Sequence, residues 1–345
     1  MDPVAIKTDD YVWVDVRTPS EYSRGHVPGA YNLPLFTDGE RAEVGTVYAR
    51  QGKNAAIERG LELTGGRLAD MLRQGKALSE KGRLMLYCWR GGMRSASVAW
   101  LLRLQNIDLE VFPGGYRAYR NAFESLLRQP WRFIVLGGPT LCGKTEILHR
   151  LAQNGEQVLD LEGMAHHKGS AFGALGQEPQ PGNETFSNML HVRMERFSLQ
   201  RPVWCEDESL NLGKVVLPLG FHALLSAAPL VWIERPLEAR IARGMKEYGQ
   251  MPPQLLSACL AKLQRRMGGD RVREGIAAIE KGNIAQALEN TLAYYDKTYL
   301  FAWRKRPGKT VHRMFCTEGT DEICRDLMLF SSGFMQTNQT VICQP

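Results

Sequence analysis

A cysteine followed by glycines stands between two apolar segments of different periodicity. The run Leu84–Tyr87 is short and continuously apolar, as in a buried strand, whereas Ser95–Leu104 repeats apolar residues at helical spacing, with Ser95 where a helix cap would stand. The connecting loop reads Cys88-Trp89-Arg90-Gly91-Gly92-Met93-Arg94-Ser95. Backbone N–H groups of such a loop, together with a helix N-terminus, favour the thiolate, which is the nucleophile. We therefore predict that Cys88 and Arg94 are catalytic and that Trp89, Arg90, Gly91, Gly92 and Met93 form an oxyanion cradle between them.

The alternative for Cys88 is a buried core cysteine that precedes a glycine turn, which is the more frequent role of a lone cysteine. The chain contains seven cysteines, and none is paired as Cys-x-x-Cys. An odd number at scattered positions argues against a disulfide framework and against a structural zinc site. Any cysteine with a function is therefore expected to act as a thiol.

A second glycine loop follows the strand-like run Phe133–Leu136. Its sequence is Gly138-Pro139-Thr140-Leu141-Cys142-Gly143-Lys144-Thr145, which fits Gly-x4-Gly-Lys-Ser/Thr, and a helix is expected from Thr145. The N–H groups of such a loop bind phosphate oxygens, the lysine reaches the outer phosphate, and the threonine can ligate a metal. We predict a phosphate site formed by Gly138, Thr140, Gly143, Lys144 and Thr145. Leu141 stands where many such loops carry a glycine in a strained conformation, which puts nucleotide turnover in doubt more than phosphate binding.

Charged side chains are expected around this phosphate loop. The acidic candidates, which follow two of the expected strands, are Asp160, Glu206, Asp207 and Glu208, with Glu162 as a further one. Carboxylates at strand ends can hold Mg²⁺ or its waters, although a solvated run of charges explains them equally well. The basic candidates Arg235, Arg240 and Arg243 would close over phosphates as a lid or form one face of an exposed helix.

The order of the expected elements defines the fold class. Further strand-like runs are Tyr11–Val16, Val158–Leu161, Val203–Cys205, Leu230–Ile233 and Val311–Phe315, and helical patterns lie at 186–199 and 255–267. Alternating strands and helices predict a mostly parallel α/β sheet covered on both faces. We expect a first domain at 1–128, a P-loop NTPase-like domain with a helical C-terminal part at 131–331, and a loosely held tail without pattern at 332–345.

Length and composition limit the class of protein. The 345 residues suffice for two cores of ordinary size, and 44% hydrophobic with 23% charged residues exclude a disordered chain. The apolar stretches are too short for a membrane span and no secretory signal is visible, so we expect a cytoplasmic protein without membrane partners. A net charge of +6 permits a polyanionic partner such as RNA, although an evenly solvated surface explains it as well.

The first domain resembles the rhodanese domain, whose cysteine carries transferable sulfur as a persulfide. The resemblance rests on Asp15–Tyr22, on Gly25–Pro34, on the Cys88 loop and on the closing Gly114-Gly115-Tyr116. Many single-domain rhodaneses read Cys-x-x-Gly-x-Arg-Ser, whereas this loop has one more residue before Arg94. We hypothesise that the wider cradle admits a larger donor anion.

The two domains in this order resemble one family, the tRNA 2-selenouridine synthases. The matching segments are Glu40–Tyr48, Gly52–Ile57, Asp160–Gly173 and Glu206–Ser209 with Gly213 and Pro218, and the resemblance extends to about Phe330. Ser187 departs from the acidic residue usual in the Phe-Glu-Asn stretch of that family, which is Phe186-Ser187-Asn188 here.

The resemblance implies a transferase that converts wobble 2-thiouridine of tRNA to 2-selenouridine. The phosphate-loop domain would bind geranyl diphosphate and alkylate the base sulfur, and selenium from selenophosphate would then replace it in a step that requires Cys88. A selenophosphate-supplying enzyme would be a further partner. Our candidates for RNA contacts, with domain packing as the equal alternative, are His167, Lys168, Trp303, Arg304, Lys305 and Arg306. The alternative function is a rhodanese-type sulfurtransferase with an ATP-binding regulatory domain.

Overall fold

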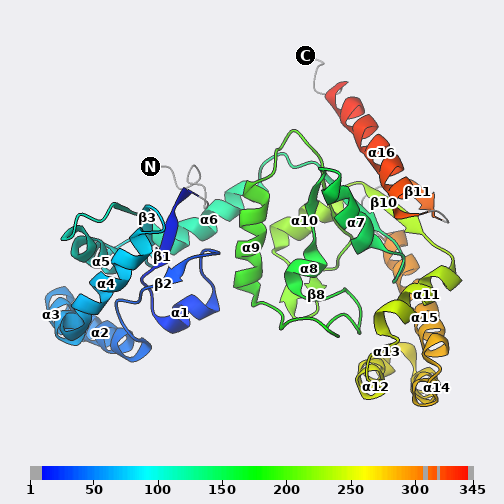
Figure 1. Ribbon diagram of the computed structural model, residues 1–345, viewed down its shortest axis with the longest axis horizontal. Coiled ribbons are helices and arrows are strands. Elements are labelled where there is room, and N and C mark those ends of the chain that lie inside the picture. Colours follow the sequence, from blue (N-terminus) through cyan, green and yellow to red (C-terminus); the bar gives the residue numbers. More distant parts are fainter. Residues whose placement is uncertain (1–9, 306–309, 317–318, 341–345) are drawn as a thin grey trace. The chain divides into compact units, whose positions relative to one another are not determined.

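The computed structural model describes residues 10–305, 310–316 and 319–340, which form two compact units (Figure 1). Unit 1 contains the chain up to Arg128 and also Gly182–Arg196, and unit 2 contains Gln129–Pro181 and the chain from Phe197 onward. The chain therefore leaves unit 2, adds one helix to unit 1 and returns. Our division of the sequence at residue 128 did not include this return.

Unit 1 is built on a four-stranded parallel sheet in the order β2-β1-β3-β4. Its elements are β1 (Val12–Asp15), α1 (Pro19–Arg24), β2 (Tyr31–Asn32), α2 (Asp38–Gln51), α3 (Lys53–Thr64), the 3-10 turn η3 (Gly65–Arg67), α4 (Leu68–Ser79), β3 (Leu84–Tyr87), α5 (Met93–Arg103), β4 (Leu109–Val111), α6 (Gly115–Leu127) and α9 (Asn183–Glu195). The predicted parallel sheet is confirmed here.

Strand β3 is buried on both faces, which explains its continuously apolar sequence. Because side chains alternate along a strand, Leu84 and Leu86 join a cluster with α4 and α5, whereas Met85 and Tyr87 join an aromatic cluster with α6. Packing on both faces of the sheet holds β3 in place up to Tyr87, and the cysteine loop begins at the next residue.

Unit 2 contains a five-stranded parallel sheet in the order β11-β10-β5-β7-β6 and a short antiparallel pair, β8–β9. Its elements are β5 (Phe133–Gly137), α7 (Lys144–Gln153), β6 (Gln157–Leu159), α8 (Leu161–Ala165), β7 (Val203–Glu206), β8 (Asn211–Leu212), β9 (Val215–Val216), α10 (Leu219–Ala227), β10 (Leu230–Glu234), α11 (Leu237–Tyr248), α12 (Pro253–Ala261), α13 (Gln264–Met267), α14 (Gly269–Glu280), α15 (Ile284–Lys305), β11 (Thr310–Phe315) and α16 (Thr320–Thr340). All five residues of β5 are buried, as expected for a central parallel strand.

Two separate cores hold unit 2 together. One lies on the sheet, where Ile147 of α7 and Leu327 of α16 pack against the strands. The other belongs to the helical part and includes Tyr248 of α11, Leu260 of α12 and Leu288 of α15. The helical C-terminal part expected from the sequence is therefore present within unit 2 and has its own hydrophobic core.

Two local expectations were wrong. The chain after Gly333 is not without pattern, because α16 continues to Thr340, and 341–345 lie outside the described residues. Buried Ile323 and Leu327 anchor the beginning of this helix, and an anchored helix propagates readily through the Met and Gln residues that follow. Ser95 is not a cap, because α5 already begins at Met93 and Ser95 lies buried in its first turn.

Candidate active site

The Cys88 sulfur lies at the junction between the end of β3 and the beginning of α5. The residue is buried, with 4% of its surface exposed. Its Sγ accepts a hydrogen bond from the backbone N–H of Gly92 at 3.3 Å and lies 3.3 Å from the hydroxyl of Ser95. The same hydroxyl is within 3.0 Å of the Gly92 carbonyl oxygen, so its single proton can serve either acceptor.

These contacts favour the thiolate of Cys88. Burial acts to raise the pKa of this thiol, but hydrogen bonds from the Ser95 hydroxyl and from backbone N–H groups, including those of Arg90 and Gly92, outweigh it, and the pKa lies below its ordinary value. The helix N-terminus adds partial positive charge at the same place. The site therefore increases the fraction of Cys88 that is present as the nucleophilic thiolate.

The first turn of α6 packs against the backbone of the cysteine loop. Gly91 and Gly115 both adopt left-handed backbone conformations, with φ of +64° and +62°. A Cβ on Gly115 would lie 2.3 Å from the Cys88 carbonyl oxygen, which shows how closely the two segments approach. The backbone N–H of Tyr116 donates to that same oxygen at 2.8 Å.

The guanidinium of Arg94, which we predicted to be catalytic, is paired with a carboxylate of α1. Its two terminal nitrogens donate to the Glu21 carboxylate at 2.6 and 3.2 Å. Burial acts to raise the pKa of Glu21, but the hydrogen bond and charge of Arg94 outweigh burial. The pKa of Glu21 therefore lies below its ordinary value, which favours an ionised pair. The polar groups that contact Sγ are loop N–H groups and Ser95, while Trp89 and Met93 form an exposed apolar rim with 41% and 50% of their surfaces accessible.

The phosphate loop connects β5 to α7 beside a cavity of about 370 Å³. Among the side chains that line it are Lys144, Thr145, Glu162, Arg243, Tyr248 and Tyr299. Lys144 Nζ donates to the Gly138 carbonyl oxygen at 3.1 Å, and the Thr145 hydroxyl donates to Glu162 at 3.0 Å. Of the five predicted residues, Thr140, Gly143, Lys144 and Thr145 line this cavity at the N-terminus of α7, a place suited to an anion, and Gly138 does not.

Leu141 adopts the left-handed conformation that its position in the motif predicted, with a φ of +64°. This conformation is unfavourable for leucine. Its side chain packs against the helical core of unit 2, where a Cβ on Gly244 would lie 2.8 Å from both Leu141 Cδ1 and Leu288 Cδ1. Apolar packing therefore offsets the backbone strain, and the phosphate loop is joined to α11 and α15.

The acidic candidates occupy different positions around this cavity. Glu162 contacts Thr145, whereas Asp160 caps α8 through Gly163 at 2.7 Å and contacts His149 at 2.7 Å. Glu162 makes this contact although its sequence support, like that of Asp160, was weaker than that of Glu206–Glu208, because α8 was not predicted. Among residues 10–305, 310–316 and 319–340, no group of three or more His, Cys, Asp or Glu side chains is arranged to hold a metal ion.

The Glu206-Asp207-Glu208 run is not a solvated charge run. Glu206 is fully buried and accepts a hydrogen bond from the Leu161 N–H at 2.9 Å. Burial, reinforced by Asp160, raises the pKa of the Glu206 carboxyl well above its ordinary range, which favours the protonated form. Glu208 lies beside Glu162, since a Cβ on Gly169 would lie within 3.0 Å of both carboxylates.

The three arginines that follow β10 all reach the phosphate loop. Arg235 Nε donates to the Cys142 carbonyl oxygen at 3.0 Å, and Arg240 Nε donates to the Thr140 carbonyl oxygen at 2.9 Å. Arg243 pairs with Glu146 at 2.5 Å and lines the cavity. The exposed-face alternative is excluded for Arg240, which is buried.

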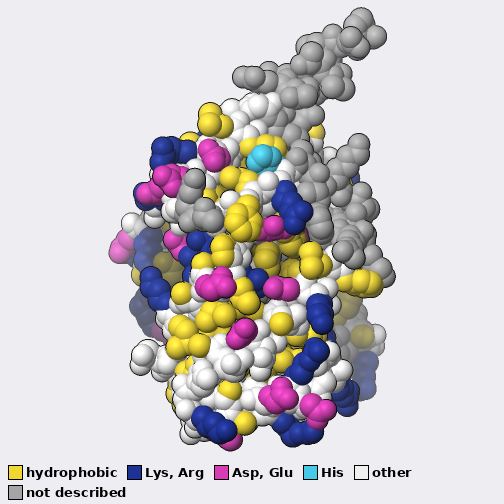
Figure 2. Space-filling view, turned by 90° about the vertical axis from the view of Figure 1, so that its right-hand side faces the viewer, with side chains coloured by type: hydrophobic (Ala, Val, Ile, Leu, Met, Phe, Trp, Pro, Cys, Tyr) yellow, Lys and Arg dark blue, Asp and Glu magenta, His cyan; other side chains and the backbone are white. Residues whose placement is uncertain are grey.

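The expected RNA contacts do not form one described surface. His167 is half-buried, and Lys168 lines the phosphate cavity and pairs with Glu247. Trp303, Arg304 and Lys305 lie in α15 without described side chains, and Arg306 lies outside the described residues. On the face that Figure 2 presents, the visible Lys and Arg side chains lie among acidic and hydrophobic ones, without a continuous basic patch.

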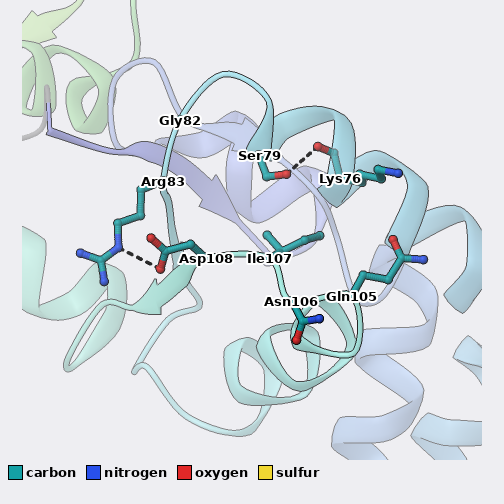
Figure 3. A pocket seen from close by; sticks show the side chains of 8 residues that line it. All are labelled: Lys76, Ser79, Gly82, Arg83, Gln105, Asn106, Ile107 and Asp108. Atoms are coloured by element: carbon teal, nitrogen blue, oxygen red, sulfur yellow. Dashed lines mark hydrogen bonds and ion pairs between the residues drawn. The ribbon is translucent and has the colours of Figure 1, made fainter.

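A larger hollow, of about 780 Å³, lies in unit 1 (Figure 3). Its lining includes Lys76, Arg83 and Asp108, and Arg83 donates to Asp108 at 3.1 Å. None of its lining residues belongs to the cysteine loop, and we assign no chemistry to it. In the described part of the chain, no helix combines the length and apolar character needed to span a membrane.

The fold and the two loops define a two-domain α/β protein in which a rhodanese-like domain precedes a P-loop domain. A family model for the rhodanese-like domain matches residues 5–122, and a model described as the tRNA 2-selenouridine synthase AAA domain matches residues 131–254. Proteins named tRNA 2-selenouridine synthase from Nitrosomonas europaea and Azotobacter vinelandii are 33% and 37% identical to this chain. Each alignment covers 88% of this chain, and 92% and 90% of the two relatives respectively. The chain belongs to the tRNA 2-selenouridine synthase family.

Proposed function

We propose that this protein converts 2-thiouridine at the tRNA wobble position to 2-selenouridine in two steps. In the first, the base sulfur attacks the C1 atom of geranyl diphosphate, the C–O bond breaks and diphosphate leaves. In the second, selenium of selenophosphate attacks C2 of the base, geranyl thiol leaves, and water cleaves the Se–P bond to release phosphate. The observation that carries the proposal is that one chain of this family holds two glycine loops at helix N-termini, one with a thiol and one with a lysine.

The phosphate-loop cavity suits a compact diphosphate with an apolar tail. Its volume of about 370 Å³ lies near the lower end of the roughly 300–1,000 Å³ range of small-ligand pockets. Lys144 and the N-terminus of α7 supply positive charge for the diphosphate. Leu141, Tyr248 and Tyr299 supply apolar and aromatic surface on the same cavity for an isoprenoid chain. We further propose that Mg²⁺ assists departure of the diphosphate, with Glu162 and Thr145 as its candidate ligands.

The cysteine loop has features that suit the binding of selenophosphate. Its N–H groups and the α5 N-terminus favour anions, and its exposed Trp89 and Met93 side chains offer apolar surface to an alkylated base. We assign selenation to Cys88 and geranylation to the phosphate loop. The tRNA and an enzyme that supplies selenophosphate are the proposed partners.

Nucleoside mass spectrometry of thiolated tRNA incubated with the purified protein tests this division. With geranyl diphosphate and selenophosphate present, Cys88→Ser should accumulate S-geranyl nucleoside without 2-selenouridine, and Lys144→Ala should form neither. Lys297→Ala, which removes an exposed lysine outside the cavity, is the matched control and should behave like the parent. Equal loss of both products in folded Cys88→Ser would contradict the division, and ATP consumption without RNA would favour the regulated sulfurtransferase.

A further inference from the structure

Helix α9 belongs to unit 1 although its sequence lies between β6 and β7 of unit 2. It packs beside α6 (Figure 1), and its central polar residue is Asn188, which is 1% exposed. Asn188 Nδ2 donates to the Tyr116 hydroxyl at 2.6 Å and to the His26 carbonyl oxygen at 2.8 Å. Its Oδ1 accepts a hydrogen bond from Arg120 at 2.7 Å. Both ends of the amide are therefore used, as buried polar groups require.

Tyr116 joins this amide to the cysteine loop. At its backbone end, its N–H donates to the Cys88 carbonyl oxygen at 2.8 Å. At its phenol end, it is held by Asn188, and the Arg17 guanidinium lies 3.9 Å from the centre of its ring. The residue before it, Gly115, approaches the cysteine loop so closely that a Cβ there would lie 2.3 Å from the Cys88 carbonyl oxygen. A shift of the phenol would therefore move the turn on which the loop rests, because packed interiors transmit displacement.

We propose that Asn188 is a positioning residue for the cysteine loop, which it acts on through Tyr116. Helix α9 fixes the first turn of α6, and that turn holds the loop N–H groups directed at Sγ. The rhodanese-like unit of this chain is complete only with a helix supplied from within the sequence of the second domain. The importance of this contact for catalysis rests on the proposed role of Cys88, whereas its effect on the thiol does not depend on the identity of the substrate.

The first test is the pH dependence of Cys88 alkylation by iodoacetamide in the full chain, followed on the Cys88 peptide by mass spectrometry. Asn188→Asp keeps the acceptor for Arg120 but removes both donors. We expect the inflection to rise by about half to one pH unit, which is roughly a three- to tenfold smaller thiolate fraction at neutral pH. Asn154→Asp, at an exposed site after α7, is the matched control. An unchanged inflection in folded Asn188→Asp overturns the proposal.

Tyr116→Phe removes only the phenol oxygen and adds no buried charge, so it tests independently whether Asn188 acts on the cysteine loop through Tyr116. We expect a rise of the Cys88 inflection in this variant too, and a double variant whose shift does not exceed that of Asn188→Asp alone. Shifts that add would overturn the route through Tyr116. If Asn188→Asp fails to fold, the result for Tyr116→Phe decides, because an unchanged inflection there also overturns the route.

Turnover separates this inference from the proposed function. Asn188→Asp should slow selenation at least threefold while geranylation stays within about twofold of the parent, since the phosphate loop belongs to the other unit. Slowing of both steps to the same extent overturns the inference. If the parent protein modifies no thiolated tRNA but the alkylation shift is observed, the proposed function fails and the positioning role of Asn188 stands.

Discussion

The hydroxyl of Ser95 is a side-chain hydrogen-bond partner of Cys88, and its removal gives a sharp test of the cysteine loop. In the thiol form, Cys88 can donate to Ser95 Oγ while the hydroxyl donates to the Gly92 carbonyl oxygen at 3.0 Å. In the thiolate form, the hydroxyl can turn its proton to Sγ, which lies at 3.3 Å. The serine therefore stabilises the charged form of Cys88 more than the neutral form, and Ser95→Ala removes that preference.

The size of the effect follows from the nature of the acceptor. A hydrogen bond to a charged group contributes about 1.5–3 kcal/mol, and sulfur, which is a weaker acceptor than oxygen, places this one at the lower end. One pKa unit corresponds to about 1.4 kcal/mol, so Ser95→Ala should raise the pKa of Cys88 by about one unit. The thiolate fraction at neutral pH then falls roughly tenfold, and the alkylation rate falls with it.

Alkylation of the Cys88 peptide by iodoacetamide, measured from pH 5 to pH 10, reads this shift directly. Ser97→Ala is the matched control, because Ser97 lies in the same helix with an exposed side chain. The direction of the Cys88 pKa shift also determines how folding stability changes with pH. Because the pKa of Cys88 is lowered in the folded state, its stabilising contribution is present above the ordinary thiol pKa and is lost as the pH falls through the lowered value. A parent-like inflection in folded Ser95→Ala would refute the assigned hydrogen-bonding role.

Two further variants test unit 2. Burial, with neighbouring acidic groups, raises the pKa of Glu206 above the unfolded value of about 4.3, so the folding stability of the parent should fall as the pH rises from there. Glu206→Gln removes this loss, and its Tm relative to the parent should therefore increase between pH 5 and pH 8; a constant difference would contradict the protonated state. Leu141→Ile keeps the apolar volume but places a β-branched residue in a left-handed conformation, at a cost of about 1 kcal/mol. Calorimetric titration should show roughly fivefold weaker binding of inorganic pyrophosphate, with Leu219→Ile at an exposed site as the control.

Both glycine loops were predictable from the sequence because each is local. The strand, the glycine loop and the helix follow one another within about twenty residues, and the motif marked position 141 as one where many loops carry a glycine in a strained conformation. Arg94 shows the limit of this reasoning. Its partner Glu21 lies 73 positions earlier in the chain and is brought close only by the tertiary fold. Residue type identified Arg94 as a candidate, but the type alone did not show that a carboxylate of α1 already pairs with its guanidinium.

Helix α9 was predicted as a helix but was assigned to the wrong neighbour. Helical periodicity identifies which face of a segment is apolar, and it contains no information on which of two domains receives that face. The deciding contacts are polar and distant in sequence, such as those of Asn188 to Tyr116 and to His26. An isolated asparagine in a helical pattern gives no such signal, because it is as typical of an exposed helix face as of a buried network.

The two loops hold their donors in place by different means. In the phosphate loop, cationic side chains occupy the carbonyl oxygens of Gly138, Thr140 and Cys142, so the loop backbone is fixed and positive charge is already gathered there. In the cysteine loop, the backbone itself supplies the donors, and a neighbouring helix turn holds them. Because ordering donors at the moment of binding costs free energy, a loop fixed beforehand binds an anion more tightly. The phosphate loop should therefore depend on its charges, and the cysteine loop on its packing, which is why a buried asparagine in α9 can matter to the sulfur.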